Sequence, residues 1–512
     1  MNLYAAETEI ELLEKVLKRA VPGDALIAAK VALAWHLRQR DSARTLRLVR
    51  EVMPVVGAAA AFAQGDGIAA CHSRAALAAA EASTFYCEFD EAERCLRHVR
   101  AHFAPTWDPE AEGDAWLVES ILARGRGQPE RELEALARAV VFFDTRGALE
   151  RLAIARIWAV YARSLTHADA HAPHPAETAR ELGAETQLAW NAIHDAALAN
   201  ALSHREPAAA VALFKRASDQ ASQLGMVHLE VNCLLASGDA SRELGDFDLA
   251  ARCFNLATDR AYATGWPTLM GSCNVRIGEL LCDLGAFDES QAIIGESTDT
   301  LAVCPRGTVL AFACSALART LLAMGKPDQS LEPMSKAIDL FRQAGSGRDL
   351  AVNLILQARA LAAAQRPDEV LAVLGEAISL IDELSLDALR VGVSDILADL
   401  HHRYPLLPPP GMTMPTAALH YAETMLGDGL RIEGWKPRAA SHAFLAERWS
   451  EAGDHTRAYD YACQALVAKE RETAQKMNYP LALLRTRRRA EVLDGPMQAL
   501  VPVDGGDACN EA

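Results

Sequence analysis

One short phrase returns every 40 residues through the middle of this chain. It reads ELGDFDLAARCF at residues 243–254, and DLGAFDESQAII, AMGKPDQSLEPM and AAQRPDEVLAVL follow at the same interval. A fixed period of this length indicates one supersecondary unit per period, and such units must stack because none buries its apolar face alone. The chain of 512 residues is therefore expected to form an extended array rather than one ordinary core.

The chemistry of the phrase predicts that one helix ends there and another begins. Gly245, Gly285 and Gly325 stand at the turn, and glycine tolerates the positive φ that ends a helix. Phe or Pro follows two residues later and is usually followed by an acid. Proline suits the first helical turn, and an acid there faces the positive end of the helix dipole. We expect a unit of helix, tight turn and helix, followed by a looser loop.

Small residues recur at fixed places around each turn, seven positions before it and five and twelve after it. Gly238 and Gly278 occupy the first of these places. Because a glycine inside a helix costs about 1 kcal/mol relative to alanine, its presence predicts that two helices approach closely there. Alanine runs and the scarcity of strand-like alternation favour an all-α fold with almost no sheet.

This spacing of small residues around a turn resembles the tetratricopeptide repeat (TPR) superfamily. The match is strongest in LLASGDASRELGDFDLAARCFNLA, residues 234–257, and the resemblance extends over residues 70–480. The usual unit has about 34 residues, so the helices or loops are longer in this chain. The resemblance implies an α-solenoid of roughly ten helix-turn-helix repeats, in which the first helices of successive units line a concave surface.

The pattern divides the chain into segments of different regularity. They are a degenerate N-terminal repeat region or cap at 1–70, TPR-like repeats at 71–163, a loop or subdomain break at 164–177, regular repeats at 178–400, a proline-rich insertion at 401–415, C-terminal repeats with a capping helix at 416–495, and a disordered tail at 496–512.

Composition narrows the classes of partner. The net charge of −17 argues against nucleic acid, whose binding needs a basic face. No apolar run approaches the ~20 residues of a membrane helix, and the N-terminus lacks a signal pattern. The 11 cysteines form no CxxC pair and are expected as free thiols. These features predict a cytoplasmic protein without membrane contact.

No catalytic or cofactor motif stands out, so we expect neither an enzyme nor a cofactor. His167, Asp169, His171 and His174 form the most metal-like cluster, but their Ala/Pro-rich setting favours a solvated loop over a zinc site. QAGSGRDL at 343–350 lacks the phosphate-loop pattern and is interpreted as a link between units. A metal- or nucleotide-dependent enzyme with an unrecognised site remains an open alternative.

The concave surface that the resemblance implies is the candidate binding site. Asp239, Glu279, Arg319 and Arg359 stand six residues before successive turns, which makes two acids followed by two arginines. An asparagine amide can pair with both the N–H and the C=O of an extended peptide. The other candidates are Asn232, Glu243, Asn274, Asp283 and Asn353. The alternative is that Glu279 and Arg319 simply bridge neighbouring units.

These observations predict a regulatory or signal-transduction scaffold that binds another protein or an extended peptide segment in its groove, and a homodimer is possible. Residues 447–491 also resemble the junction in bacterial signalling proteins whose TPR arrays precede a diguanylate cyclase. The resemblance implies, as an alternative, the sensor region of a cyclic-di-GMP signalling protein whose output domain is absent.

Overall fold

The computed structural model describes residues 1–19, 23–61, 66–101, 108–166, 182–203, 206–303, 308–432, 434–476 and 483. These residues form helices and turns without a strand, which confirms the predicted all-α fold. None of the helices in these ranges is long and apolar enough to span a bilayer.

The helices follow one another at short intervals along the chain. The first ten are α1 (Glu7–Arg19), α2 (Asp24–Leu37), α3 (Ser42–Ala61), α4 (Asp66–Phe85), α5 (Phe89–Ala101), α6 (Ala111–Gly125), α7 (Pro129–Arg146), α8 (Leu149–Thr166), α9 (Ala184–Leu202) and α10 (Pro207–Leu224). The next six are α11 (Val227–Glu243), α12 (Phe247–Thr264), α13 (Pro267–Asp283), α14 (Phe287–Thr300), α15 (Thr308–Ala323) and α16 (Pro327–Gln343). The last six are α17 (Gly347–Ala363), α18 (Pro367–Glu383), α19 (Arg390–Arg403), α20 (Ala417–Gly429), α21 (Ala439–Glu451) and α22 (His455–Lys476).

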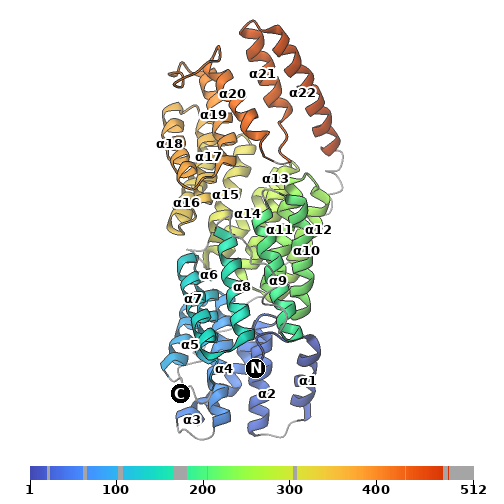
Figure 1. Cartoon of the computed structure of the whole chain (residues 1–512), viewed down its shortest axis with the longest axis vertical. Coiled ribbons are helices and arrows are strands. Elements are labelled where there is room, and N and C mark those ends of the chain that lie inside the picture. Colours follow the sequence, from blue (N-terminus) through green and yellow to red (C-terminus); the bar gives the residue numbers. More distant parts are fainter. Residues whose placement is uncertain are drawn as a thin grey trace.

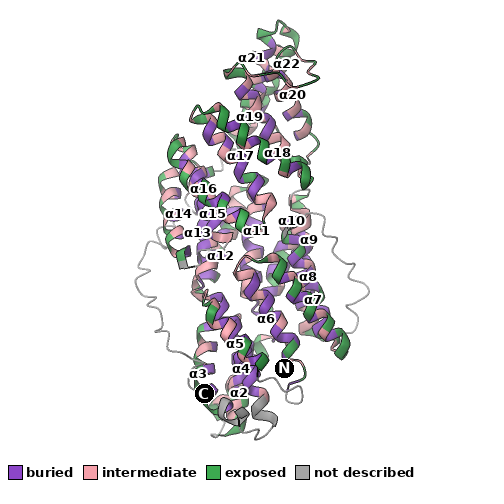
Figure 2. Cartoon of the chain, turned by 90° about the vertical axis from the view of Figure 1, so that its left-hand side faces the viewer, coloured by how far each residue is buried: buried purple, intermediate pink, exposed green. Residues whose placement is uncertain are grey.

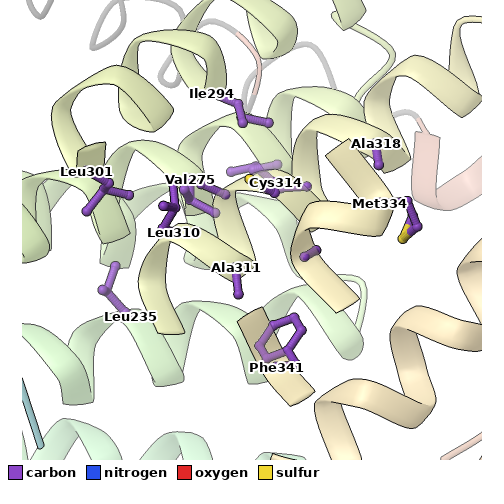
Figure 3. Packing of buried hydrophobic residues seen from close by; sticks show 14 of the residues in the cluster. Leu235, Val275, Ile294, Leu301, Leu310, Ala311, Cys314, Ala318, Met334 and Phe341 are labelled. Atoms are coloured by element: carbon purple, nitrogen blue, oxygen red, sulfur yellow. The ribbon is translucent and has the colours of Figure 1, made fainter. Parts of the chain in front are cut away.

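Consecutive helices pack against each other and build an elongated solenoid (Figure 1). Buried residues gather between the helices, while exposed residues follow their outer faces (Figure 2). The largest hydrophobic cluster runs from α11 to α19, and Figure 3 shows part of it, including Leu235, Val275 and Phe341. The core is therefore continuous across these units, as stacked repeats require.

The predicted turns are present, and the connections between units are as tight as those within them. Gly245, Gly285 and Gly325 have φ angles of 80°, 82° and 73°. The expectation of a looser loop between units is wrong in this region, because α12 ends at Thr264 and α13 begins at Pro267. Left-handed glycines also end the second helices, at Gly225, Gly265 and Gly345. The periods that contain them thus consist of two similar halves, whereas α14 ends at Thr300 and α15 begins only at Thr308.

The close approach predicted at the two helical glycines is confirmed. A β-carbon at Gly238 would lie 2.3 Å from Cε1 of Phe254, and one at Gly278 would lie 2.3 Å from Cγ1 of Ile294. Each glycine therefore makes room for a large side chain of the second helix in its own unit.

Some expected boundaries shift in the structure. Helix α19 continues to Arg403 and α20 begins at Ala417. The proline-rich segment between them therefore starts at residue 404, three residues after the expected start at 401. Residues 167–177 of the expected loop, the 496–512 tail and most of the expected capping segment lie outside the described residues. Leu483 is described, and it packs against the largest cluster.

The superhelix also brings distant repeats into contact. Phe85, at the end of α4, stacks on Trp266 with ring centroids 4.2 Å apart. Beside this pair, the Tyr86 hydroxyl donates a hydrogen bond of 3.1 Å to the carbonyl oxygen of Thr264, 178 residues away in sequence. The N-terminal helices are thereby fixed against the middle of the array.

Candidate functional site

The nine predicted site residues lie on the first helices of four successive units. Helix α11 carries Asn232, Asp239 and Glu243, α13 carries Asn274, Glu279 and Asp283, α15 carries Arg319, and α17 carries Asn353 and Arg359.

Glu279 is the centre of an ion-pair network that joins three of these helices. Its carboxylate lies 2.9 Å from Nη2 of Arg319 on α15 and 2.7 Å from Nη1 of Arg276 on its own helix. Arg242 on α11 approaches it to 3.6 Å. The contact between Glu279 and Arg319 is the bridge between neighbouring units that the alternative interpretation requires.

Two arginines that the sequence analysis did not select neutralise the predicted acids. Arg276 pairs with Asp239 at 2.8 Å, and Arg242 pairs with Asp283 at 3.3 Å. Each arginine stands three residues from a selected acid on the same helix, so helical spacing could have identified both.

Burial and charge act differently on the four predicted acids. Burial raises the pKa of Asp239, of Glu243 and of Asp283 above the usual value of each group. Burial opposes ionisation of Glu279 too, but the guanidinium groups of Arg319, Arg242 and Arg276 outweigh it and hold the Glu279 pKa well below its usual range. Oδ1 of Asp239 is buried and accepts no hydrogen bond among the described residues.

The remaining candidates make local contacts. Arg359 pairs with Asp395 on α19 at 3.1 Å. The Asn274 amide donates to the Tyr262 hydroxyl at 3.0 Å, and the Asn353 amide donates to the backbone oxygen of Asp349 at 2.8 Å. Asn274 and Asn353 are 4% and 3% exposed, so these contacts lie inside the array and not on an open surface.

A cavity of about 230 Å³ lies between the two halves of the array. Among its lining residues are Glu81 of α4, Asp114 and Arg124 of α6, Trp158 of α8, Asn232 of α11 and Ser272 of α13. Asn232 is the one residue of the predicted nine that lines it. The polar lining of this cavity therefore comes largely from the N-terminal half, which carries none of the nine predicted site residues.

Several buried charges support that N-terminal lining. Nε of Arg38 donates to Glu81 at 2.7 Å, and Nε of Arg151 donates to Asp114 at 3.0 Å. All four side chains are buried. The 40-residue phrase is weak in this half, so no repeat register indicated which of its residues face inward.

The described residues contain no group of three or more side chains suited to holding a metal ion. His167, Asp169, His171 and His174 lie outside those residues. Eight described cysteines are free, whereas Cys87 is disulfide-bonded, so the expectation of free thiols is wrong at that residue.

Comparison with solved structures confirms the resemblance at the level of fold. No protein-family model and no curated protein matches the sequence. One similar structure is a Rap protein complexed with competence and sporulation factor. The alignment includes 72% of the present chain and 100% of the Rap chain, at 10% sequence identity and a TM-score of 0.51. The Rap conjugation gene regulator of plasmid pLS20, in complex with the Phr* peptide, covers 73% and 97% at 12% identity and a TM-score of 0.47. The quorum sensor NprR from B. thuringiensis covers 77% and 97% at 12% identity and a TM-score of 0.43. The first of these shows that the chain has the fold of a TPR-type helical repeat array.

Proposed function

We propose that this chain is a non-catalytic regulatory scaffold that binds a protein or an extended peptide segment on its inner surface. The observation that carries the proposal is the cavity between the two halves, lined by polar side chains of the helices that begin successive units. Concave sites with a few placed polar groups are where proteins bind their ligands.

One feature of the inner helices supports this function. Glu279 and Arg319, which pair with each other, would hold α13 and α15 in place beneath the partner.

The shared fold supports a regulatory role. The Rap protein that has this fold is solved in complex with competence and sporulation factor. We infer that the present chain likewise couples binding of a partner on its inner surface to regulation.

Site-specific photocrosslinking in cells tests the location of the site. A photoreactive amino acid at Asn232, which lines the cavity, should crosslink a partner protein or peptide. The same amino acid at Leu256, which is half exposed on α12, is the matched control and should not. Crosslinks at Leu256 alone, or at neither position, would contradict binding on the inner surface. Circular dichroism melting of both variants verifies that they fold.

A further inference from the structure

The first six residues form a non-helical segment, bent at Leu3 and Tyr4, among the helices of the N-terminal half. They form no helix, and α1 begins only at Glu7. Figure 1 shows the N-terminus beside α2, α4 and α8. Leu3 packs against three separate hydrophobic clusters, which are built from α2–α6, α6–α8 and α8–α11. The segment therefore lies where several inner helices converge, as a bound peptide would.

The helices bind this segment mainly through its backbone. Four of its carbonyl oxygens accept hydrogen bonds from side chains of the array: Met1 from Arg151 at 2.7 Å, Asn2 from Trp35 at 2.8 Å, Leu3 from Arg38 at 2.9 Å and Ala5 from Arg40 at 2.6 Å. Such contacts recognise a non-helical chain by its free carbonyl groups, whatever its side chains.

The donors are held in position by the rest of the array. Arg38 is only 4% exposed, and its Nε and Nη1 are engaged by Glu81 and by the backbone oxygen of Trp35. Its guanidinium also stacks on the Trp35 ring, 4.0 Å from the centroid. Arg151 is fixed in the same way by Asp114. A donor that is already fixed loses little entropy on binding, so this is a preorganised site.

Two side chains of the segment are recognised as well. The Tyr4 hydroxyl accepts a hydrogen bond of 3.1 Å from Nε1 of Trp158, and burial raises the pKa of Tyr4 to about 12, so the phenol stays neutral. Leu3 supplies the apolar contacts, whereas the side chain of Asn2 is exposed. The site thus recognises a Leu-Tyr pair on a bent, non-helical backbone.

We propose that this site binds non-helical peptide segments that bend at a Leu-Tyr pair, and that residues 1–6 occupy it in cis and compete with the partner. The inference rests on the proposed function and deepens it, because it names the chemistry of the ligand. Leu3 and Tyr4 line the same cavity as Asn232 and Ser272, so a longer partner segment would continue from this site toward α11 and α13.

Binding of a labelled peptide to the full chain tests the proposal. The probe is acetyl-Met-Asn-Leu-Tyr-Ala-Ala with a fluorophore at its C-terminus, followed by anisotropy. Leu3→Asp with Tyr4→Asp should release the cis segment, because two charges cannot be buried there, and should raise the affinity for the probe at least tenfold over the unaltered chain. Asn2→Ala is the matched control and should change the affinity less than twofold, since its side chain is exposed.

The Tyr4 contact gives a second arm. In the chain with Leu3→Asp and Tyr4→Asp, adding Trp158→Phe should weaken the probe about fivefold, as expected for one lost hydrogen bond. A probe with Phe in place of Tyr should bind the released chain equally well with and without Trp158→Phe, because it has no hydroxyl to accept the hydrogen bond. Equal weak binding of the original probe to the unaltered and released chains would overturn the proposal.

Thiol labelling keeps the test decisive if the charged variant misfolds. Ala5 is 3% exposed, so Ala5→Cys should react at least tenfold more slowly than the exposed Cys463 of the same chain. Saturating probe should remove most of that difference, whereas rapid labelling without the probe would overturn the proposal.

If these results fail while Asn232 still crosslinks a partner, the cis segment is refuted and the binding function stands. If the probe binds and Asn232 captures nothing, the proposed function fails instead.

Discussion

Single residues set how closely the helices of one unit approach. The ring of Phe254 fills the place that a β-carbon of Gly238 would take. By contrast, a β-carbon at Gly375, inside α18, would meet nothing within 4 Å. The same residue type thus has a packing role on α11 and none on α18.

Substituting both glycines by alanine should change stability in opposite directions. Gly238→Ala should lower the free energy of unfolding by about 1–3 kcal/mol, because the methyl group displaces Phe254. Gly375→Ala should raise it by up to about 1 kcal/mol through helix propensity. Urea denaturation measures both changes. Shifts of the same sign and size would show that α11 and α12 do not pack as described.

Helices of neighbouring units are joined by ion pairs whose strength depends on burial. Arg319 and Glu279 pair between α15 and α13, where the Glu279 side chain is 10% exposed. Arg342 and Glu376 pair between α16 and α18 at 2.8 Å, with both side chains about half exposed. A pair in water contributes about 0–1 kcal/mol, whereas breaking a buried one leaves an uncompensated charge.

Charge reversal separates these two pairs. Arg319→Glu should lower the free energy of unfolding by at least about 2 kcal/mol, because it places a second carboxylate beside Glu279. The control Arg342→Glu should cost about 1 kcal/mol or less. Thermal melts and binding to the captured partner are measured on each variant. A stable Arg319→Glu chain that has lost its partner would instead assign Arg319 to the binding surface.

The sequence predicted the elements of the regular region better than those of the site. Gly245, Gly285 and their flanking residues specify turns locally, so the helices and the inner position of Glu279 follow from the register. The connection at Gly265 was missed because Pro267 follows it without the acid of the repeated phrase, although Gly265 ends the helix in the same conformation. The hydrogen bond from Arg151 to Met1 joins residues 150 apart, and no local pattern reports a contact of that kind.

The molecule as a whole departs from the nearest-neighbour behaviour of an ideal solenoid. The stacking of Phe85 on Trp266 couples the first repeats to the middle of the array. In a simple repeat array each unit contacts only its neighbours, and unfolding can begin anywhere. Here the two halves are expected to unfold together.

Removing that contact should separate the two halves. Trp266→Ala should cost about 3–5 kcal/mol and split the calorimetric unfolding peak in two. Phe143→Ala is the control, because Phe143 is fully buried in a cluster confined to α6–α8. It should cost a similar amount and leave a single peak. A single peak for both variants would mean that the coupling runs through other contacts.

His36, which is buried, and His228, which is partly buried beside the cavity, make the stability of the whole molecule depend on pH. Burial lowers the pKa of His36 and of His228 to about 3. The unfolded chain therefore binds more protons below its ordinary histidine pKa of about 6.5, and stability falls as the pH drops from there toward about 3.

One substitution tests the size of this effect. Each of the two histidines should contribute a loss of about 1.4 kcal/mol per pH unit well below pH 6.5. His228→Gln should remove one of these contributions from the slope measured by urea denaturation between about pH 6 and 5. His455→Gln, at an exposed residue, should leave the slope unchanged. An unaltered slope in the His228 variant would show that this residue does not resist protonation.

The two similar halves of a regular period also govern how such an array can gain or lose length. Loss of residues 286–325, one full period of 40, would join Gly285 to Lys326 and keep every later helix on its own face. Loss of residues 266–285, half a period, would join Gly265 to Ala286 and bring the second helix of a unit to the inner side for the rest of the chain. Deletions of 40 codons should therefore preserve the fold of the remaining array. Deletions of 20 codons should disrupt its packing, although both kinds rejoin the chain at a left-handed turn.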